Sequence, residues 1–289
     1  MRGQVFAPLA GALLVLAACG GGSGGSDAPA RDPGRALTNY DRADPNGSNS
    51  GPGVSGSVAR LYSDAAGQIR LDMVDGPMAG MVIFCEDRSG AQCHVNAAGV
   101  GATGTGSLSA RRKGDYAYVG QFVVNHDQNG TLYANTHSVH GANPARGRTD
   151  VRLPDGAQQY NGQFAAGAGV NHENGTSTGM ATGAATILAN FDTATVSGRL
   201  TGALDNGQGP AVNVVFNGLN INRGAASFRS DNTSRIEFQG ERAWGEIEGA
   251  FYGPDAQEAA GAFSFGNDQG GMSGVFLTCR RGLDCIQPE

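Results

Sequence analysis

From about residue 180 onward, an apolar residue or a glycine recurs at every second position of the chain. In the clearest run, Val196, Gly198, Leu200, Gly202 and Leu204 alternate mainly with polar residues. A period of two is typical of a strand in an antiparallel sheet that has one face in the core and the other in solvent. Similar runs lie near residues 212–216, 235–239, 247–251 and 261–265. The pattern therefore predicts an all-β fold.

Glycine supports the same interpretation, because it occupies 48 of the 289 positions. An interior glycine costs a helix roughly 1 kcal/mol relative to alanine, so such a chain cannot be mostly helical. Inward-facing glycines suit a small barrel, in which strands bend sharply and the interior narrows. About eight strands fit between Gln158 and Cys279, and closing them would remove the exposed edges of an open sheet. We therefore expect an antiparallel β-barrel of about eight strands.

The region before this barrel carries weaker strand patterns. We interpret residues 57–155 as a smaller, β-rich, handle-like domain and residues 156–289 as the barrel, with the boundary near Pro154. Residues 20–56 consist mainly of Gly, Ser, Asp, Pro and Asn, and such a segment cannot bury enough apolar surface to offset its chain entropy. Residues 19–56 are therefore expected to form a lipidated cysteine followed by a disordered tether.

The first 18 residues have the pattern of a secretory signal peptide. Arg2 is the only charge before an apolar run over residues 5–18, which is short for a membrane span. The run ends in Leu16-Ala17-Ala18-Cys19, which resembles the lipobox of bacterial lipoproteins. That resemblance implies cleavage before Cys19, acylation of its thiol and amino group, and sorting to the outer membrane, because no aspartate follows. The alternative is an ordinary signal cleaved after an Ala-x-Ala-like site.

If Cys19 carries lipid, four cysteines remain in two short-range pairs. We predict the disulfides Cys85–Cys93 and Cys279–Cys285, because export supplies an oxidising compartment. The alternative is a zinc site made of all four, but neither pair has the Cys-x2-Cys spacing that such sites usually show.

Three stretches of the proposed barrel carry a family resemblance. They are residues 160–164 (Tyr-Asn-Gly-Gln-Phe), 190–200 (Asn-Phe-Asp-Thr-Ala-Thr-Val-Ser-Gly-Arg-Leu) and 249–263 (Gly-Ala-Phe-Tyr-Gly-Pro-Asp-Ala-Gln-Glu-Ala-Ala-Gly-Ala-Phe). The chain resembles the transferrin-binding protein B barrel family of Gram-negative surface lipoproteins, and the third stretch is similar to that family's most specific signature. The signature favours a fold more than a ligand, because its Gly-Pro pair makes a turn and Gly261, Phe263 and Phe265 would fill the barrel.

The resemblance implies an outer-membrane, cell-surface binding protein with one handle and one barrel, and no enzymatic activity. Its implied role is capture of haem or of a host or environmental iron or haem protein, with a TonB-dependent outer-membrane receptor as a further partner. Smaller relatives bind haem or complement regulators, so an adhesin or host-protein binder with no metal or haem role is the second hypothesis. A structural envelope lipoprotein or an enzyme is the least favoured class.

The candidate ligand-binding residues are His126, Tyr133, His137, His140, His172 and Trp244. Imidazole and phenolate groups would ligate haem iron, and the His137-Ser-Val-His140 stretch could bring two imidazoles together. The favoured alternative is that these histidines are only solvated in polar turns. Trp244 is the only tryptophan, and aromatic residues are enriched at binding hot spots, but packing against a neighbouring strand or the first domain is the favoured alternative for it.

Other function classes lack sequence support. A net charge of −6 argues against a nucleic-acid partner. The sequence contains no His-Glu-x-x-His, phosphate loop or Gly-x-Ser-x-Gly motif, so neither a catalytic nor a metal site is predicted.

Overall fold

The fold was analysed in a computed structural model of the chain. It describes residues 34–42, 53–63, 69–73, 80–86, 92–97, 102–128, 131–143, 150–173 and 175–286. Regular structure in these residues is β, apart from the single 3-10 turn η1 (Asp205–Gly207). The all-β prediction is confirmed. None of the helical structure in these ranges is long and apolar enough to cross a membrane.

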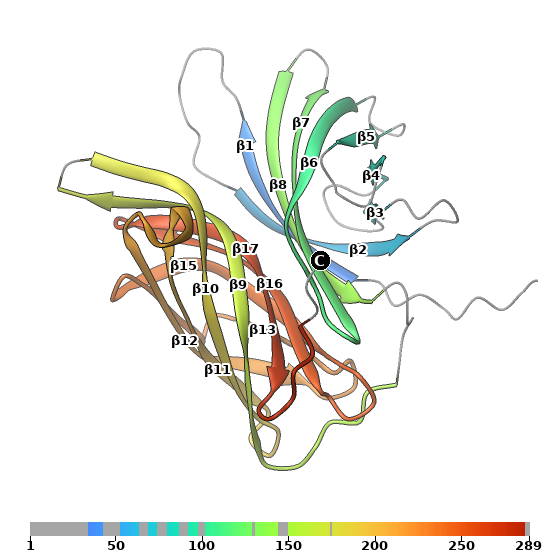
Figure 1. The fold of residues 1–289 in the computed structure, drawn as a ribbon, viewed down its shortest axis with the longest axis vertical. Coiled ribbons are helices and arrows are strands. Elements are labelled where there is room, and N and C mark those ends of the chain that lie inside the picture. Colours follow the sequence, from blue (N-terminus) through green and yellow to red (C-terminus); the bar gives the residue numbers. More distant parts are fainter. Residues whose placement is uncertain are drawn as a thin grey trace, which may run out of the picture.

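The N-terminal strands form a closed antiparallel barrel in which β1 pairs with both β2 and β8 (Figure 1). Its strands are β1 (Gly34–Arg42), β2 (Gly53–Ser63), β3 (Ile69–Met73), β4 (Val82–Cys85), β5 (Cys93–Ala97), β6 (Ala102–Lys113), β7 (Ala117–Gln128) and β8 (Thr131–Ala142). The handle-like domain is thus itself a ring rather than an open sheet.

Strand β1 and the start of β2 lie inside the segment expected to be a tether. There the backbone of β1 is paired on both sides, by β2 and by β8. The expectation of a tether is wrong for these residues, because closing the ring satisfies backbone groups on both edges of β1 even though its sequence is poor in large apolar residues. The signal peptide, Cys19 and residues 20–33 lie outside the described residues.

The C-terminal strands form the larger sheet. They are β9 (Ala157–His172), β10 (Gly175–Asn190), β11 (Thr195–Leu204), β12 (Ala211–Asn222), β13 (Ser227–Arg229), β14 (Arg235–Phe238), β15 (Glu241–Tyr252), β16 (Glu258–Asn267) and β17 (Gly270–Arg280). The first strand, β9, pairs with the last, β17, and β11 pairs with β12. The short strands β13 and β14 both bridge β12 and β15. The ring therefore has eight strand positions, as predicted.

The interior of this barrel contains nine phenylalanines, which are Phe164, Phe191, Phe216, Phe228, Phe238, Phe251, Phe263, Phe265 and Phe276. Several face a glycine directly across the sheet, as Phe276 faces Gly261 and Phe228 faces Gly249. A Cβ on Gly261 would lie 2.4 Å from Cζ of Phe276. These inward glycines therefore make room for aromatic rings.

One side of the C-terminal barrel is covered by the N-terminal barrel. The apolar residues at this junction are Ala117, Val119, Tyr252, Ala260, Ala262, Val275 and Leu277. Both faces of β16 and β17 are buried along most of their length, one inside the barrel and the other at the junction. The two barrels lie against each other over these strands (Figure 1).

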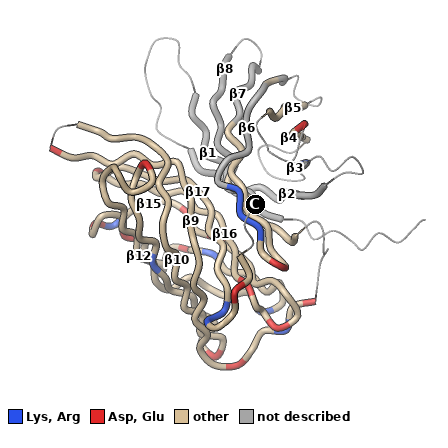
Figure 2. Tube along the Cα trace, viewed as in Figure 1, with Lys and Arg blue, Asp and Glu red and all other residues tan. Residues whose placement is uncertain are grey.

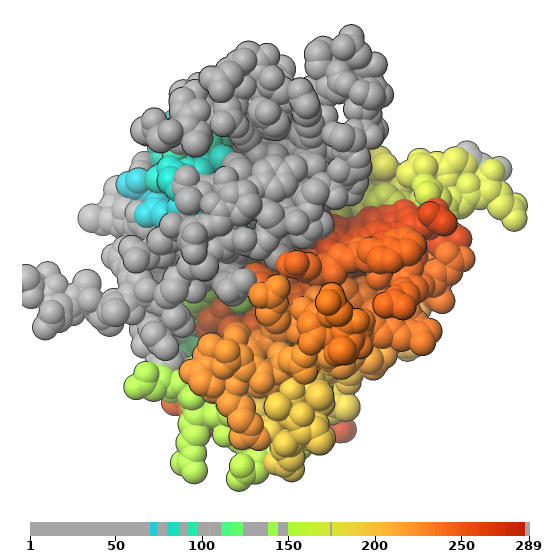
Figure 3. Space-filling view, turned by 180° about the vertical axis from the view of Figure 1, so that it is seen from behind, coloured from blue at the N-terminus to red at the C-terminus, as the bar shows by residue number. Residues whose placement is uncertain are grey.

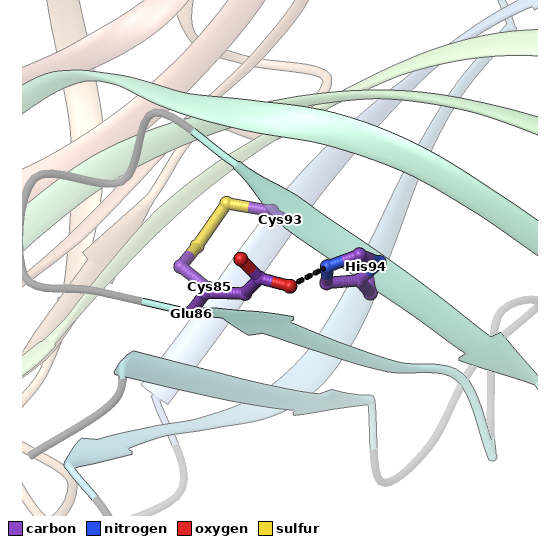
Figure 4. A network of polar contacts seen from close by, with 4 residues as sticks. All are labelled: Cys85, Glu86, Cys93 and His94. Carbon is purple, nitrogen blue, oxygen red and sulfur yellow. Dashed lines mark hydrogen bonds and ion pairs between the residues drawn. A yellow bond between two sulfur atoms is a disulfide. The ribbon is translucent and has the colours of Figure 1, made fainter.

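Both predicted disulfides are present. Cys85 and Cys93 are cross-strand neighbours on β4 and β5, and Cys279 at the end of β17 is bonded to Cys285. Next to the first disulfide, His94 Nε2 lies 2.7 Å from Glu86 Oε1 (Figure 4). The His94 ring also stacks on Phe84. The zinc alternative is excluded, because all four cysteines are oxidised in pairs.

Candidate binding surfaces

Four of the predicted residues, His126, Tyr133, His137 and His140, lie on the β7–β8 hairpin. His126 on β7 is the direct cross-strand neighbour of Tyr133 on β8. His137 lies four residues further along β8 and faces Phe122 across the hairpin. The side chains of His126, Tyr133 and His137 are outside the described part of the chain, so their role in binding stays a prediction.

His140 is buried at the junction between the barrels. Its Nδ1 lies 2.7 Å from the hydroxyl of Tyr252 on β15, and the two rings meet edge to face. A spacing of three residues in a strand places backbone positions 137 and 140 on opposite faces of β8. His140 is therefore a contact between the barrels, and the expectation that it is a solvated turn residue is wrong.

His172 is the last residue of β9, in the C-terminal barrel. The β9–β10 hairpin extends beyond the end of β11, because β11 pairs with β10 only from Ala181 onward (Figure 1). His172 is exposed near the tip of this hairpin, with Nε2 2.9 Å from Ser177 Oγ. The structure thus distributes the predicted residues over separate surfaces. Among the side chains that can be described, no group of three or more His, Cys, Asp or Glu residues could hold a metal ion.

Trp244 on β15 is exposed, with a relative solvent-accessible surface of 68%. The expectation that it packs against a neighbouring strand or the first domain is wrong. Its cross-strand neighbour is Gly266, which in turn pairs with Gly271, and Gly271 pairs with Gly169. The indole therefore lies at the end of a cross-strand row in which the next three strands, β16, β17 and β9, each have a glycine. Figure 3 shows the molecule from behind, with β15–β17 in orange to red.

An exposed tryptophan beside bare backbone is suited to contact with a partner. The ring offers a large apolar area with a polar N–H, and such residues are enriched at binding hot spots. The glycine row allows a partner to approach the sheet closely. We call Trp244 with Gly266, Gly271 and Gly169 the Trp244 surface.

The junction between the barrels is organised by a buried carboxylate. Glu258, the first residue of β16, accepts hydrogen bonds from the backbone N–H groups of Asp115 at 2.7 Å, Tyr116 at 3.1 Å and Ala117 at 2.7 Å. Burial raises the pKa of Glu258 to about 7, against the three N–H donors, which lower it. This carboxylate therefore fixes the β6–β7 turn of the N-terminal barrel onto the C-terminal barrel.

A second polar cluster lies further along the same junction. Gln121 on β7 donates through Nε2 to the carbonyl oxygen of Ser273 at 2.6 Å. The hydroxyls of Ser138 and Ser273 lie 3.3 Å apart. These contacts and the apolar cluster around Ala260 give the junction both a packed core and specific polar pairing.

Residues 153–280 match the family model of the C-lobe and N-lobe beta barrels of Tf-binding protein B. This range contains all strands of the larger barrel and the Trp244 surface. The C-terminal barrel is transferrin-binding protein B-like. Among curated proteins, none matches the chain.

The solved structures similar to the chain include transferrin-binding and lactoferrin-binding proteins. Transferrin Binding Protein B of Haemophilus parasuis, a double mutant, has 17% identity and a TM-score of 0.47, over 88% of this chain and 45% of that one. The protein from Neisseria meningitidis has 17% identity and a TM-score of 0.33, over 85% and 43%. The N-lobe of Lactoferrin Binding Protein B of Moraxella bovis has 13% identity and a TM-score of 0.38, over 86% and 99%. The chain thus spans less than half the length of the first two.

The signature of the transferrin-binding protein B-like barrel has a physical explanation in this structure. Gly261 and Phe263 belong to the packed interior, as expected. Gly253 has φ of +84°, and the turn that it begins with Pro254 joins β15 to β16. The glutamate of the signature, Glu258, serves the junction with the N-terminal barrel. Sequence reasoning missed this role, although a glutamate directly before the apolar run of residues 259–263 was a signal that it has buried partners.

Proposed function

We propose that this protein is a lipid-anchored surface receptor that binds an iron-carrying host protein and takes no catalytic part in releasing the iron. The match of residues 153–280 to the barrels of Tf-binding protein B carries the proposal. Cys19 would anchor the chain to the outer membrane of a Gram-negative bacterium. Iron from the captured carrier would then cross that membrane through a TonB-dependent receptor, the second proposed partner.

The Trp244 surface is the proposed contact area on the barrel. It is exposed, contains the only tryptophan, and lies on strands whose positions are fixed by the ring. Leu188 on β10 is also exposed, at 46%, but its neighbours on the outer face are not a row of glycines. Leu188 therefore provides a matched control for a non-specific apolar contact.

The experiment is a binding measurement between the full chain and immobilised transferrin or lactoferrin, each in iron-loaded and iron-free form. We expect saturable binding to an iron-carrying protein, and at least a tenfold loss of affinity for Trp244→Ala with no loss for Leu188→Ala. Absence of binding to every iron carrier would overturn the proposal. In that case an adhesin or host-protein binder on the same scaffold, with no metal or haem role, becomes the better hypothesis.

Haem capture is the second candidate function. The observation that favours it is the direct cross-strand pairing of His126 with Tyr133 on the β7–β8 hairpin. Both residue types ligate haem iron. This candidate needs no partner protein and is tested separately by titration with haemin.

A further inference from the structure

A groove lies beside the junction, between the outer face of the C-terminal barrel and β6 of the N-terminal barrel. Its volume is about 460 Å³, within the roughly 300–1,000 Å³ typical of small-molecule sites. The polar side chains that line it are those of Arg112, Gln163, Thr182 and Asn206. Gly162 and Gly183 contribute lining without side chains, so the backbone of β9 and β10 is accessible there.

The register of β6 explains how Arg112 reaches this position. Pairing between β6 and β7 shifts between Ser109 and Arg112, which marks a bulge, and bulges redirect side chains. Beyond the bulge Arg112 pairs with Val119, which is buried at the junction. The strand that carries Arg112 is thereby held over the adjacent β9–β10 surface. Figure 2 shows the cations of β6 as a blue stretch where it passes the C-terminal barrel.

The positive charge of the Arg112 guanidinium is not neutralised by a carboxylate among the described residues. Its Nη1 donates to the carbonyl oxygen of Arg111 at 2.7 Å. Arg111 and Lys113 flank it with two further positive charges. Of these three cations only Arg112 lines the groove, so a chain with a net charge of −6 places one positive charge there.

The barrel contributes neutral polar groups opposite this charge. Gln163 on β9 and Thr182 on β10 lie on the same face of the β9–β10 ladder, in two pairs that are separated by the Phe164–Gly183 pair, so both are held by a rigid sheet. Asn206, in η1, has φ of +55°, a left-handed conformation that asparagine tolerates. The neighbouring Asp205 lies against Gly179, and the groove lining contains no acidic residue.

We propose that this groove binds a small hydroxylated acid, a carboxylate or phosphate carried on a sugar-sized molecule. Arg112 would pair with the oxyanion, because guanidinium groups form bidentate hydrogen bonds with carboxylates and phosphates. The amides of Gln163 and Asn206 and the hydroxyl of Thr182 would bind hydroxyl groups, because each can donate and accept. The site is separate from the Trp244 surface and independent of the proposed iron carrier.

The test is calorimetric titration of the full chain with glucuronate, glucose 6-phosphate and glucose at low ionic strength. We expect one of the two acids to bind with a one-to-one stoichiometry and glucose to show no saturable binding. Glucuronate binding would assign a carboxylate ligand, and glucose 6-phosphate binding a phosphate ligand. Arg112→Gln should weaken the acid at least tenfold, and Thr182→Val should weaken it to a smaller extent.

Arg199→Gln is the matched control, because Arg199 is an exposed arginine on the outer face of β11. It should leave the affinity unchanged. A thermal unfolding midpoint of Arg112→Gln equal to that of the wild type would show that the variant is folded. The proposal is overturned if neither acid binds the wild type, if folded Arg112→Gln binds as the wild type does, or if Arg112 affects only the capture of a protein.

Discussion

The carboxylate of Glu258 accepts a hydrogen bond from the backbone N–H of Ala117 at 2.7 Å, although the two residues belong to different barrels. Two further N–H groups of the same turn, those of Asp115 and Tyr116, point to the same carboxylate. One side chain thus accepts hydrogen bonds from three backbone N–H groups, which would otherwise be buried at the junction without an acceptor.

Replacing Glu258 by alanine should destabilise the protein by about 2–3 kcal/mol, because buried donors lose a charged acceptor. Urea unfolding of the full chain measures the change. Glu246→Ala, on the outer face of β15, is the control and should change stability by about 0.5 kcal/mol or less. A Glu258→Ala variant as stable as the control would show that the carboxylate does not fix the junction.

The raised pKa of Glu258 predicts a pH dependence of stability. Burial raises this pKa from its ordinary 4.5 to about 7, so between those values the folded state binds more protons than the unfolded state. The free energy of unfolding should therefore decrease as pH rises from 5 to 8. Comparing unfolding of the wild type with Glu258→Gln isolates this contribution, and parallel pH profiles for the two proteins would contradict it.

Substituting Gly261 by alanine should destabilise the C-terminal barrel by about 1–3 kcal/mol. The new Cβ would lie 2.3 Å from the carbonyl oxygen of Glu248 and 2.4 Å from Cζ of Phe276, so both must move. Gly167→Ala on β9 is the control, because no atom lies within 4 Å of its added Cβ. Equal thermal midpoints for the two variants would refute the steric explanation.

Changing Cys19 to alanine should release the protein from the outer membrane. The lipobox-like residues 16–19 motivate this expectation, since stable anchoring depends on the acyl chains. Membrane fractionation of cells that express wild type or variant gives the answer. Sedimentation of the variant with the outer membrane at the wild-type level would disprove anchoring through this cysteine.

A haem site on the β7–β8 hairpin predicts a saturable Soret band when the full chain is titrated with haemin. The band should be lost in a variant that combines His126→Ala with Tyr133→Phe, because these are cross-strand neighbours. His172→Ala, at the projecting β9–β10 hairpin, should bind haemin as the wild type does. A flat titration would remove haem and leave protein binding as the role of the chain.

The sequence alone determined the C-terminal barrel. The alternation from Val196 to Leu204 became β11, with its apolar positions in the core and Gly198 facing Phe216 across the ladder. The alternation of residues predicts these strands because each strand of a small barrel packs one face against the interior of its own barrel. Both disulfides were predictable for a similar reason, since pairs separated by eight and six residues close locally.

Only the tertiary structure decided what covers the outer face of that barrel. Alternation distinguishes two faces of a strand, but it does not tell solvent from a second domain. Ala260 and Ala262 face the N-terminal barrel, whereas Trp244 on the neighbouring strand is exposed. Arg112 and Gln163 meet across the domain junction at one groove, and β1 belongs to a ring rather than a tether. These placements depend on contacts between distant segments, which no local pattern of residues encodes.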